Sequence, residues 1–326
     1  MIQNPDGKIP VLVLFGPTAS GKTEILSELF GKGRGPEAEI VSADSMQVYR
    51  GMDIGTAKPS PAEREKLPHH LIDIRDPDEQ FNAGDFVRLA AAACAGVQSR
   101  GRLPVLSGGA GFYLRNFILG LPESPPSDAG IRSRIKEDLK SRGAAALFAE
   151  LAAGDPVSAG RIHVNDGYRL TRALEVLRQS GRPLSSYGRN SSGDDGPFSF
   201  IILGLRRPRE ELYRRINERC AAMFRGGLFE EVRRLRDSGY GPGDPGLRAI
   251  GYREFFVEDG EGRFTLSENF AAVEELVARN SRRYAKRQIA CFATIPGATW
   301  IDAGGSDAPD YGAAELVGRE LEKRLG

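Results

Sequence analysis

A short segment near the start of the chain constrains its fold more than any other. Residues Gly16–Thr23 read Gly-Pro-Thr-Ala-Ser-Gly-Lys-Thr, which fits the phosphate-binding loop pattern G-x-x-x-x-G-K-[ST]. The apolar run Pro10–Phe15 before this segment predicts a buried parallel strand, and residues Thr23–Phe30 after it predict a helix. A strand, a glycine-rich loop and a helix in this order indicate an α/β protein that binds a diphosphate or triphosphate. The alternative is a glycine-rich turn without a ligand.

The residues of this loop have expected roles in binding phosphate. In such loops, successive backbone N–H groups point inward and bind phosphate oxygens, supported by the helix dipole. Lys22 adds a positive charge, and the Thr23 hydroxyl is a candidate ligand of Mg²⁺. The expected phosphate-binding residues are Gly16, Pro17, Thr18, Ala19, Ser20, Gly21, Lys22 and Thr23. A nucleotide such as ATP is the first ligand that the pattern suggests.

The composition is that of an ordinary globular protein. The 326 residues are 40% hydrophobic and 27% charged, and they suffice for one large or two modest domains. No apolar run approaches the roughly 18 residues that span a membrane, and the N-terminus lacks the layout of a signal peptide. The three cysteines lie far apart and suggest neither a disulfide framework nor a zinc site. We therefore expect a cytoplasmic protein.

Two clusters of basic residues stand out although the net charge is only +1. Six arginines fall between residues 206 and 219, and four arginines with one lysine fall between residues 279 and 287. Acidic residues accompany the first cluster. Each cluster is either a solvated helix face or a polyanion-binding surface, and charge alone does not decide between them.

Strand and helix signals alternate along most of the chain. This alternation predicts a parallel sheet with helices on both faces, which is a doubly wound α/β fold like that of P-loop NTPases. Strands are predicted at 10–15, 39–43, 69–74, 102–107, 198–205 and 298–302. Helices are predicted at 22–30, 60–66, 83–100, 208–223, 227–238 and 267–293, with one more at the C-terminus after a linker at 304–310.

The alternation stops in the middle of the chain, where only helices are predicted. They cover 129–142, 144–152 and 166–179. We expect an all-helical insertion domain at 123–196, and a core domain made of 1–122 and 197–326 with its C-terminal helices. A polar, glycine-rich loop at 189–196 closes the insertion and is expected to be mobile.

The ends of two further predicted strands limit the chemistry. Phosphate-loop hydrolases usually carry an acid at the end of a second apolar strand, but Leu103–Leu106 is followed by Ser-Gly-Gly-Ala-Gly. This favours a small-molecule transferase over a motor or switch. The strand at 39–43 is followed by Asp44, and the carboxyl ends of neighbouring parallel strands share one crevice. Asp44 is therefore a candidate general base or indirect Mg²⁺ partner, with a helix-capping or turn residue as the alternative.

Several blocks together resemble the tRNA dimethylallyltransferase (tRNA isopentenyltransferase) family. The block Ser42–Pro59 is the most specific of them, whereas a phosphate loop alone is a weak signal. The blocks follow the order of the family and cover nearly the whole chain. They are Gly16–Thr23, Ser42–Pro59, His69–Asp73, Asn165–Val176, Arg248–Arg253 and Tyr284–Ile289.

The resemblance implies a reaction and its partners. The exocyclic N6 of the adenosine next to the anticodon of tRNA attacks the first carbon of dimethylallyl diphosphate, and diphosphate leaves. Lys22 and the loop N–H groups would stabilise charge on the leaving group, Thr23 would help to hold Mg²⁺, and Asp44 would accept the N6 proton. The adenosine must be flipped out of its stack to reach the crevice. We expect a monomer that grips the anticodon stem-loop with its helical insertion.

The resemblance also implies which residues contact tRNA. It assigns the second basic cluster to the phosphate backbone of the RNA. The tRNA-contacting positions are Asp44, Ser45, Met46, Gln47, Ala110, Arg132, Tyr168, Arg169, Arg172, Arg248, Gly251, Tyr252, Arg253, Lys286, Arg287 and Gln288.

Two positions depart from the family pattern. Ala110 stands where the family usually has threonine, whose hydroxyl lies near the reacting centre, and Cys291 stands where threonine or serine is common. Two alternatives to an active prenyltransferase therefore stay open. One is a small-molecule kinase on the same fold, and the other is a tRNA-binding protein with impaired catalysis.

Overall fold

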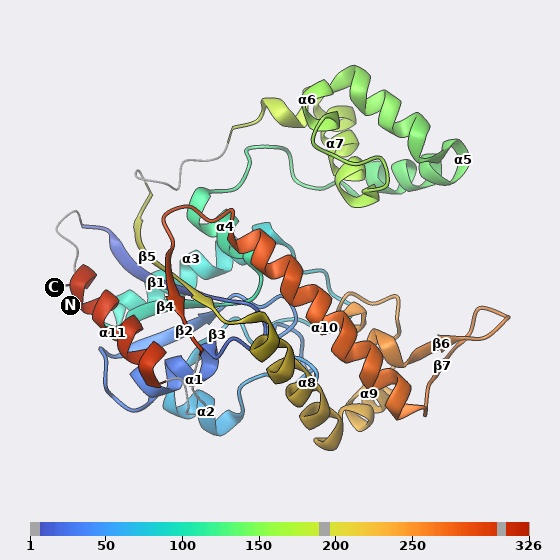
Figure 1. The fold of residues 1–326 in the computed structure, drawn as a ribbon. Helices are drawn as coiled ribbons and strands as arrows, with labels where there is room; N and C mark the ends of the chain where they lie inside the picture. The colour runs from blue at the N-terminus through green and yellow to red at the C-terminus, as the bar shows by residue number, and fades with distance from the viewer. Residues whose placement is uncertain (1–6, 189–195, 305–310, 326) are drawn as a thin grey trace. The chain divides into compact units, whose positions relative to one another are not determined.

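The structure, a computed structural model, describes residues 7–188, 196–304 and 311–325. The chain divides into two compact units (Figure 1). One unit comprises 1–118 and 192–326, and the other comprises 119–191. The predicted mobile loop at 189–196 and the predicted linker at 304–310 lie almost entirely outside the described residues. None of the described helices has the length and apolar character needed to cross a bilayer.

Six parallel strands form the sheet of the first unit, in the order β3-β2-β4-β1-β5-β8. Leu12 at the centre of β1 lies opposite Val105 of β4 and Ile201 of β5. The strand before the phosphate loop therefore lies inside the sheet, as the doubly wound fold predicts. The strands are β1 (Ile9–Phe15), β2 (Ala38–Ser42), β3 (His69–His70), β4 (Leu103–Gly108), β5 (Phe198–Arg206) and β8 (Thr299–Asp302).

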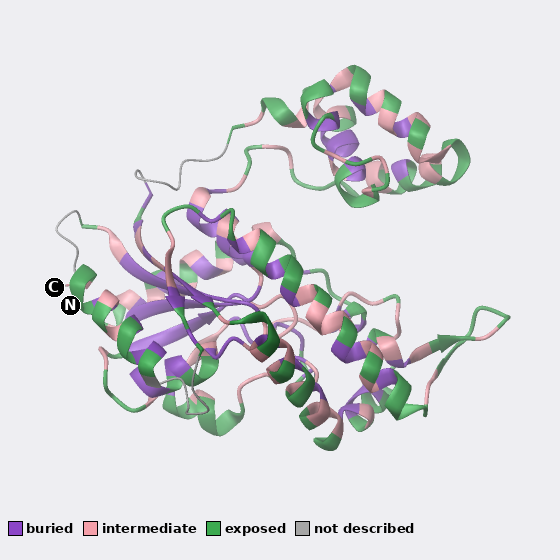
Figure 2. Ribbon diagram, in the orientation of Figure 1, coloured by how far each residue is buried: buried purple, intermediate pink, exposed green. Residues whose placement is uncertain are grey.

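Helices occupy both faces of this sheet, which confirms the predicted fold class. The side chains of a strand alternate between its faces. Leu12 and Leu14 of β1 belong to a buried cluster with α1 and α11, whereas Phe15 contacts Phe292 of α10 with tilted rings whose centroids are 4.8 Å apart. Figure 2 shows the buried sheet between its helices. The helices are α1 (Lys22–Leu26), α2 (Pro61–Lys66), α3 (Ala83–Ser99), α4 (Gly111–Leu119), α8 (Arg209–Arg225), α9 (Leu228–Asp237), α10 (Phe270–Phe292) and α11 (Tyr311–Leu325).

The second unit is helical in its described part and has a core of its own. It contains α5 (Ala129–Gly154), α6 (Pro156–Ala159) and α7 (Gly167–Ser180). Gly143 has a positive φ of 80° and divides α5 at the point where the sequence predicts two helices. The buried side chains of this core include Ile135, Leu147, Leu151, Leu170 and Leu174.

Some predicted elements differ from the observed ones. The predicted strand at 69–74 ends after His70, because Leu71 and Asp73 adopt positive φ values of 63° and 56° that no strand allows. The predicted helix at 22–30 is α-helical only to Leu26 and continues as a π-helical turn, Ser27–Gly31. Helix α4 and a hairpin of β6 (Phe256–Glu258) and β7 (Phe264–Leu266) were not predicted. Three 3₁₀ turns complete the described elements, at Leu184–Ser186, Gly246–Arg248 and Arg253–Phe255.

Candidate active site

The loop between β1 and α1 has the backbone of a phosphate cradle. Ala19 and Gly21 have positive φ values of 62° and 99°, so the chain turns sharply just before α1. A Cβ atom on Gly16 would lie 2.6 Å from the Ser20 hydroxyl, which explains why this position needs glycine. The Nζ of Lys22 folds back over the loop and donates hydrogen bonds to the carbonyl oxygens of Gly16, at 2.8 Å, and Pro17, at 3.0 Å. An ammonium group has three donors, so one remains for a ligand.

Two arginines from the segment after β5 brace the same loop. Arg207, which follows β5, donates to the Ser20 carbonyl at 3.1 Å and pairs with Glu211. Arg215 of α8 donates to the Ala19 carbonyl at 2.9 Å. Both contacts are made to backbone carbonyls, so these two arginines use none of the N–H groups of the loop.

Gln288 of α10 connects the phosphate loop to the end of β4. Its Oε1 accepts a hydrogen bond from the Thr18 N–H at 2.9 Å, and its Nε2 donates to the Gly109 carbonyl at 2.9 Å. The side chain is buried. The predicted tRNA contact at this position is therefore occupied by bonds within the protein, and Gln288 acts as a brace.

A single large cavity of about 1200 Å³ joins most of the predicted site residues. Its walls come from the phosphate loop, the loop after β2, the end of β4, α8, the segment around Arg248 and α10. The predicted residues among its lining are Thr18, Ala19, Ser20, Gly21, Lys22, Thr23, Asp44, Ser45, Met46, Gln47, Arg248, Arg253, Arg287 and Gln288. Gly16, Pro17, Ala110, Gly251, Tyr252 and Lys286 lie outside the lining.

The floor of the cavity carries two cations of unusual environment. Burial and the neighbouring guanidinium of Arg219 lower the pKa of Lys22 to about 8. Burial also lowers the pKa of Arg219, although a guanidinium stays charged at neutral pH. Arg219 makes no hydrogen bond or ion pair with any residue of the described chain. Two partly desolvated cations side by side favour a multiply charged anion between them.

Asp44 lies in the same cavity and is held by its own loop. Its Oδ1 accepts hydrogen bonds from the N–H groups of Met46, at 2.8 Å, and Gln47, at 3.3 Å. Within the described residues its other carboxylate oxygen accepts none. Oδ1 of Asp44 therefore has the bonds of a turn residue, whereas the other oxygen is the one to which the general-base hypothesis applies. Asp44 lines the same cavity as Lys22 and Arg219, and its charge opposes the lowering of the pKa of both cations.

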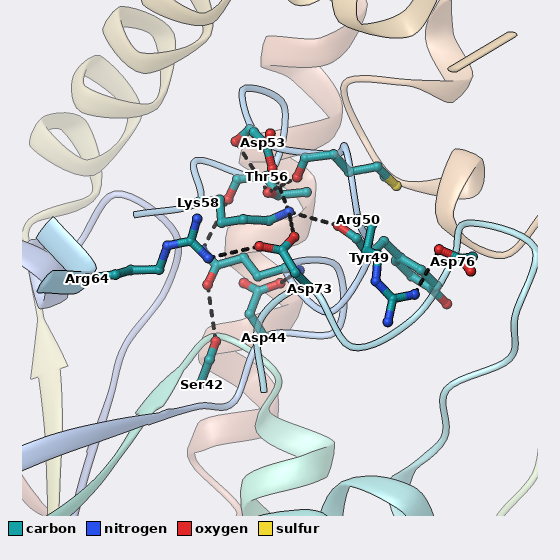
Figure 3. A network of polar contacts seen from close by, with 12 residues as sticks. Ser42, Asp44, Tyr49, Arg50, Asp53, Thr56, Lys58, Arg64, Asp73 and Asp76 are labelled. Carbon is teal, nitrogen blue, oxygen red and sulfur yellow. Dashed lines mark hydrogen bonds and ion pairs between the residues drawn. The ribbon is translucent and has the colours of Figure 1, made fainter. Parts of the chain in front are cut away.

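Gln47 also has a structural position in this loop. Its Oε1 accepts a hydrogen bond from the Ser42 hydroxyl at 3.1 Å, and its Nε2 donates to the carbonyl oxygens of Thr56, at 3.3 Å, and Ala57, at 3.2 Å (Figure 3). The amide therefore joins the beginning of the loop to its end while one side of it lines the cavity.

The predicted contacts Gly251 and Tyr252 have a different position from that expected. Tyr252 is fully buried, and its hydroxyl donates to the Glu231 carboxylate at 2.6 Å. Gly251 has a φ of 99°, which a glycine adopts readily. The side chain of Tyr252 cannot reach an RNA from this position. Of the block Arg248–Arg253, only the cavity-lining Arg248 and Arg253 present charged side chains toward the site.

The second unit carries four of the predicted tRNA contacts. Tyr168 is 71% exposed, and the guanidinium of Arg132 lies 5.6 Å from its ring centroid. Arg169 is exposed and pairs with Asp166 at 2.7 Å. The guanidinium of Arg172, by contrast, donates to the Pro125 carbonyl and to the buried Glu175 carboxylate. The geometry thus leaves Arg132, Tyr168 and Arg169 on a surface and commits Arg172 to the fold.

The first arginine cluster contains site residues that the sequence alone did not separate from a solvated face. Arg207 and Arg215 hold the phosphate loop, and Arg219 lines the cavity. The exposed Arg206 and Arg214 pair instead with Asp302 and Glu218. Arg215 and Arg219 are four residues apart in α8, which places them on one side of that helix, and Arg207 precedes it. This spacing is the signal that could have identified Arg215 and Arg219.

The donor set of the cavity fits a hard cation held mainly by a ligand. No cluster of three or more His, Cys, Asp or Glu side chains in the described ranges could bind a metal. The Thr23 hydroxyl is exposed at the cavity and bonds to no other described residue. Mg²⁺ commonly uses one or two protein oxygens, with water and phosphate oxygens completing its shell, so Thr23 suits this ion.

Comparisons with known proteins agree over most of the chain. A family model described as IPP transferase matches residues 47–294. The tRNA dimethylallyltransferase of Geobacter sulfurreducens is 46% identical over 295 residues, which cover 90% of this chain and 92% of that protein. The tRNA dimethylallyltransferase of Desulforudis audaxviator is 43% identical over 311 residues, with 95% and 97% coverage.

Solved structures show the same likeness. The full-length tRNA isopentenylpyrophosphate transferase of Bacillus halodurans has a TM-score of 0.65 at 35% identity, and the match covers 97% of this chain and 98% of that one. A eukaryotic dimethylallyltransferase acting on tRNA has a TM-score of 0.73 and covers 97% of this chain and 80% of its own. At 23% identity, this second structure shows a shared fold alone.

Proposed function

Because the chain belongs to the IPP transferase family, we propose that it transfers a dimethylallyl group from dimethylallyl diphosphate to a tRNA adenosine. The acceptor atom is N6 of the adenosine 3′ of the anticodon, and diphosphate is released. One observation carries this proposal beyond family membership. The cavity places a carboxylate with a free oxygen, Asp44, beside two partly desolvated cations, Lys22 and Arg219.

The cationic end of the cavity suits the leaving group. As the bond between C1 of the prenyl donor and its bridging oxygen breaks, the electron pair and negative charge go to the diphosphate. Lys22 is held by its hydrogen bonds to the loop before the reaction, and Arg219 and the loop N–H groups line the cavity with it, so that together they would stabilise this charge. The phosphate loop thus holds a leaving group instead of a nucleoside triphosphate.

The acidic end of the cavity suits the acceptor. The N6 lone pair forms the new bond to C1, and N6 must then lose one proton. The free oxygen of Asp44 is the carboxylate oxygen available for it, because the other oxygen already accepts two N–H bonds. A base placed in this way contributes about 10²–10⁴ in rate.

Mg²⁺ fits this arrangement as a partner of the diphosphate. The Thr23 hydroxyl would hold it, together with phosphate oxygens and water. When bound, the ion would neutralise part of the charge on the leaving group.

The acceptor RNA is proposed to lie against α10 and the exposed residues of the second unit. Arg279, Arg283 and Arg287 follow each other at intervals of four along α10, and all three are exposed. None of them has an ion-pair partner in the described chain. One interval of four residues spans about 6 Å of helix, so the three cations form a line that reaches the cavity at Arg287. Such a line suits the phosphates of an RNA strand.

A direct assay tests the proposed function. The protein would be incubated with Mg²⁺, dimethylallyl diphosphate and an unmodified anticodon stem-loop with adenosine 3′ of the anticodon. We expect prenylated adenosine in the digested RNA, and none from a matched stem-loop with guanosine at that position. Absence of product from the adenosine substrate would contradict the proposal. We further propose that the protein acts as a monomer in the cytoplasm, which sedimentation and localisation experiments can check.

A further inference from the structure

The loop between β2 and α2 has no regular structure, yet it forms one wall of the cavity. Residues 43–60 contain only turns and one isolated bridge, from Tyr49 to Arg75. Ala57 lies at a positive φ of 47°, which is unfavourable for a residue with a side chain. A segment of this kind needs contacts from elsewhere to keep one conformation. Asp44, Ser45, Met46 and Gln47 depend on it for their positions.

Glu231 of α9 supplies the largest group of such contacts. Its side chain is buried, with 1% of the residue exposed. The carboxylate accepts hydrogen bonds from three consecutive backbone N–H groups of the loop: Asp53 at 3.0 Å, Ile54 at 2.8 Å and Gly55 at 3.1 Å. A buried carboxylate needs such donors, and three successive N–H groups form a concave anion site within the protein itself.

The same carboxylate also holds the segment Arg248–Arg253, which lines the cavity as well. Tyr252 donates its hydroxyl to Glu231 Oε1 at 2.6 Å, and burial together with Glu231 raises the pKa of Tyr252 well above its usual value. The hydroxyl therefore stays a donor at every pH at which the protein is handled. The ring of Tyr252 fills the space beside Gly55, where a Cβ would come within 2.4 Å of it. One carboxylate thus links the loop after β2 to the segment that carries Arg248 and Arg253.

A buried cation holds the loop from its other side. Lys58 has 1% of its side chain exposed, and its Nζ donates to Asp53 Oδ1 at 2.6 Å, Asp73 Oδ1 at 2.6 Å and the Tyr49 carbonyl at 2.8 Å (Figure 3). Asp53 is therefore bound at its carboxylate by Lys58 and at its N–H by Glu231. These opposite charges fix the middle of the loop between them.

From these contacts we infer that Glu231 is a positioning residue for the acceptor side of the reaction. It touches no atom of the phosphate loop, and it lies outside the lining of the cavity. Its carboxylate holds the Asp44–Gln47 wall and the Arg248–Arg253 wall at one separation, which sets where the adenosine meets its base. This role rests on the proposed prenyl transfer. It predicts that loss of Glu231 weakens catalysis and leaves the diphosphate end of the cavity intact.

The test compares Glu231→Gln and Tyr252→Phe with Glu230→Gln, a change at the exposed neighbouring carboxylate on the same helix. Gln has nearly the size of Glu but carries no charge. Its amide N–H group would face the N–H groups of the loop, to which it cannot form hydrogen bonds. We expect Glu231→Gln to lower kcat with the stem-loop about ten- to hundredfold, and Tyr252→Phe to lower it less. The Kd for inorganic pyrophosphate should stay within about twofold in both. Glu230→Gln should behave like the unmutated protein.

Hydrogen exchange gives a readout that does not depend on turnover. The amides of Asp53, Ile54 and Gly55 should exchange faster in Glu231→Gln than in the unmutated protein. In Glu230→Gln their exchange rates should be unchanged. An unchanged kcat in a folded Glu231→Gln variant, or a parallel loss of pyrophosphate affinity, would overturn the inference. If Glu231→Gln does not fold, Tyr252→Phe decides by the same measurements. If the unmutated protein shows no prenyl transfer, the proposed function fails, but hydrogen exchange and pyrophosphate binding still measure whether Glu231 holds the loop.

Discussion

The two loops that form the site hold their shapes by different means. The loop between β1 and α1 has six residues, Gly16–Gly21, and its backbone turns sharply, with positive φ at Ala19 and Gly21 and with Lys22 folded back onto its carbonyl oxygens. The loop after β2 is longer and has no such local pattern. It is held by the buried charges of Lys58 and Glu231, and Glu231 lies 178 residues from its partner Asp53. The phosphate loop thus takes its turn from its own backbone, with Arg207, Arg215 and Gln288 as distant braces, whereas the loop after β2 depends on buried charged side chains, one of them from α9.

Substitutions at the acceptor end and at the diphosphate end of the cavity should therefore have different effects. A change at the acceptor end should lower turnover and leave anion binding intact, whereas a change at the phosphate loop should alter anion binding directly. Asp44→Asn, Lys22→Arg and Ala110→Thr test this separation, and Glu39→Gln tests stability away from the cavity; they follow in order of the effect that we expect.

The largest effect should follow Asp44→Asn. Asn keeps an oxygen that can accept the N–H groups of Met46 and Gln47, so the loop should keep its shape, but it cannot accept a proton. We expect kcat to fall about 10²–10⁴-fold, with stem-loop affinity nearly unchanged and pyrophosphate affinity unchanged or tighter. Single-turnover kinetics and pyrophosphate titration measure both. Equal losses in turnover and RNA affinity would mean that Asp44 only binds.

A second effect concerns the opposite end of β2 and should change stability alone. Glu39 is buried, and the hydrogen bond from Arg100, aided by His70 and Arg102, lowers its pKa from 4.5 to about 2. The folded pKa lies below the unfolded one. The stabilisation is therefore fully present above about pH 4.5 and is lost as the pH falls toward 2, by roughly 3 kcal/mol in all.

The variant Glu39→Gln should lack this pH dependence. Urea unfolding of both proteins between pH 5 and 2.5 would measure the difference in the free energy of unfolding. The expected result is a gap that narrows toward low pH, with prenyl transfer at neutral pH retained in the folded variant. A constant gap would show that the Glu39 ion pairs do not carry the acid sensitivity.

A smaller effect should follow from the titration of Lys22. Its pKa of about 8 in the free protein means that it loses its proton as the pH rises past 8, while a bound anion favours the protonated form. The affinity for inorganic pyrophosphate should therefore fall with rising pH, by up to about tenfold per pH unit above 8. In Lys22→Arg the side chain stays charged, so that only the titration of the ligand remains. Identical pH profiles in the two proteins would contradict this assignment.

The smallest effect should come from Ala110→Thr. Ala110 follows Gly109, which lines the cavity, and its N–H donates to the Ala43 carbonyl at 3.0 Å beside Asp44. A threonine hydroxyl would add one polar group near the acceptor end, worth about 1 kcal/mol or roughly fivefold in kcat/KM. Steady-state kinetics of the variant measure this. An increase of several powers of ten would support the alternative of a tRNA-binding protein whose catalysis Ala110 impairs.

Much of the fold and half of the site were accessible from the sequence. Strand, loop and helix around Gly16–Thr23 follow from apolar runs and glycine positions within 20 residues, and the structure confirms the parallel sheet that they predict. The strand predicted at 69–74 is present only at His69–His70, because Asp73 adopts a left-handed conformation and pairs with Lys58 and Arg64. The apolar pattern of this segment does not indicate those two ion pairs.

The roles of individual residues within a correctly identified block were less accessible. Tyr252 and Gln288 were expected to contact RNA, but both are buried and bonded to other parts of the protein. Arg219 was one of six arginines that could have faced solvent, yet it lines the cavity beside Lys22. A motif shows which residues occur together along the chain and does not show which of them face a ligand.

By itself, the sequence determined the order of the elements, the phosphate loop and the family of this protein. These properties depend on the conformational preferences of neighbouring residues and on the period of apolar side chains, both of which are local. Only the tertiary structure decided which arginines reach the loop, how Glu231 and Lys58 hold the wall that carries Asp44, and which predicted contacts are buried. Each of these depends on the burial of a polar or charged side chain together with a partner that is distant in the sequence. Such partners meet only when the chain has folded.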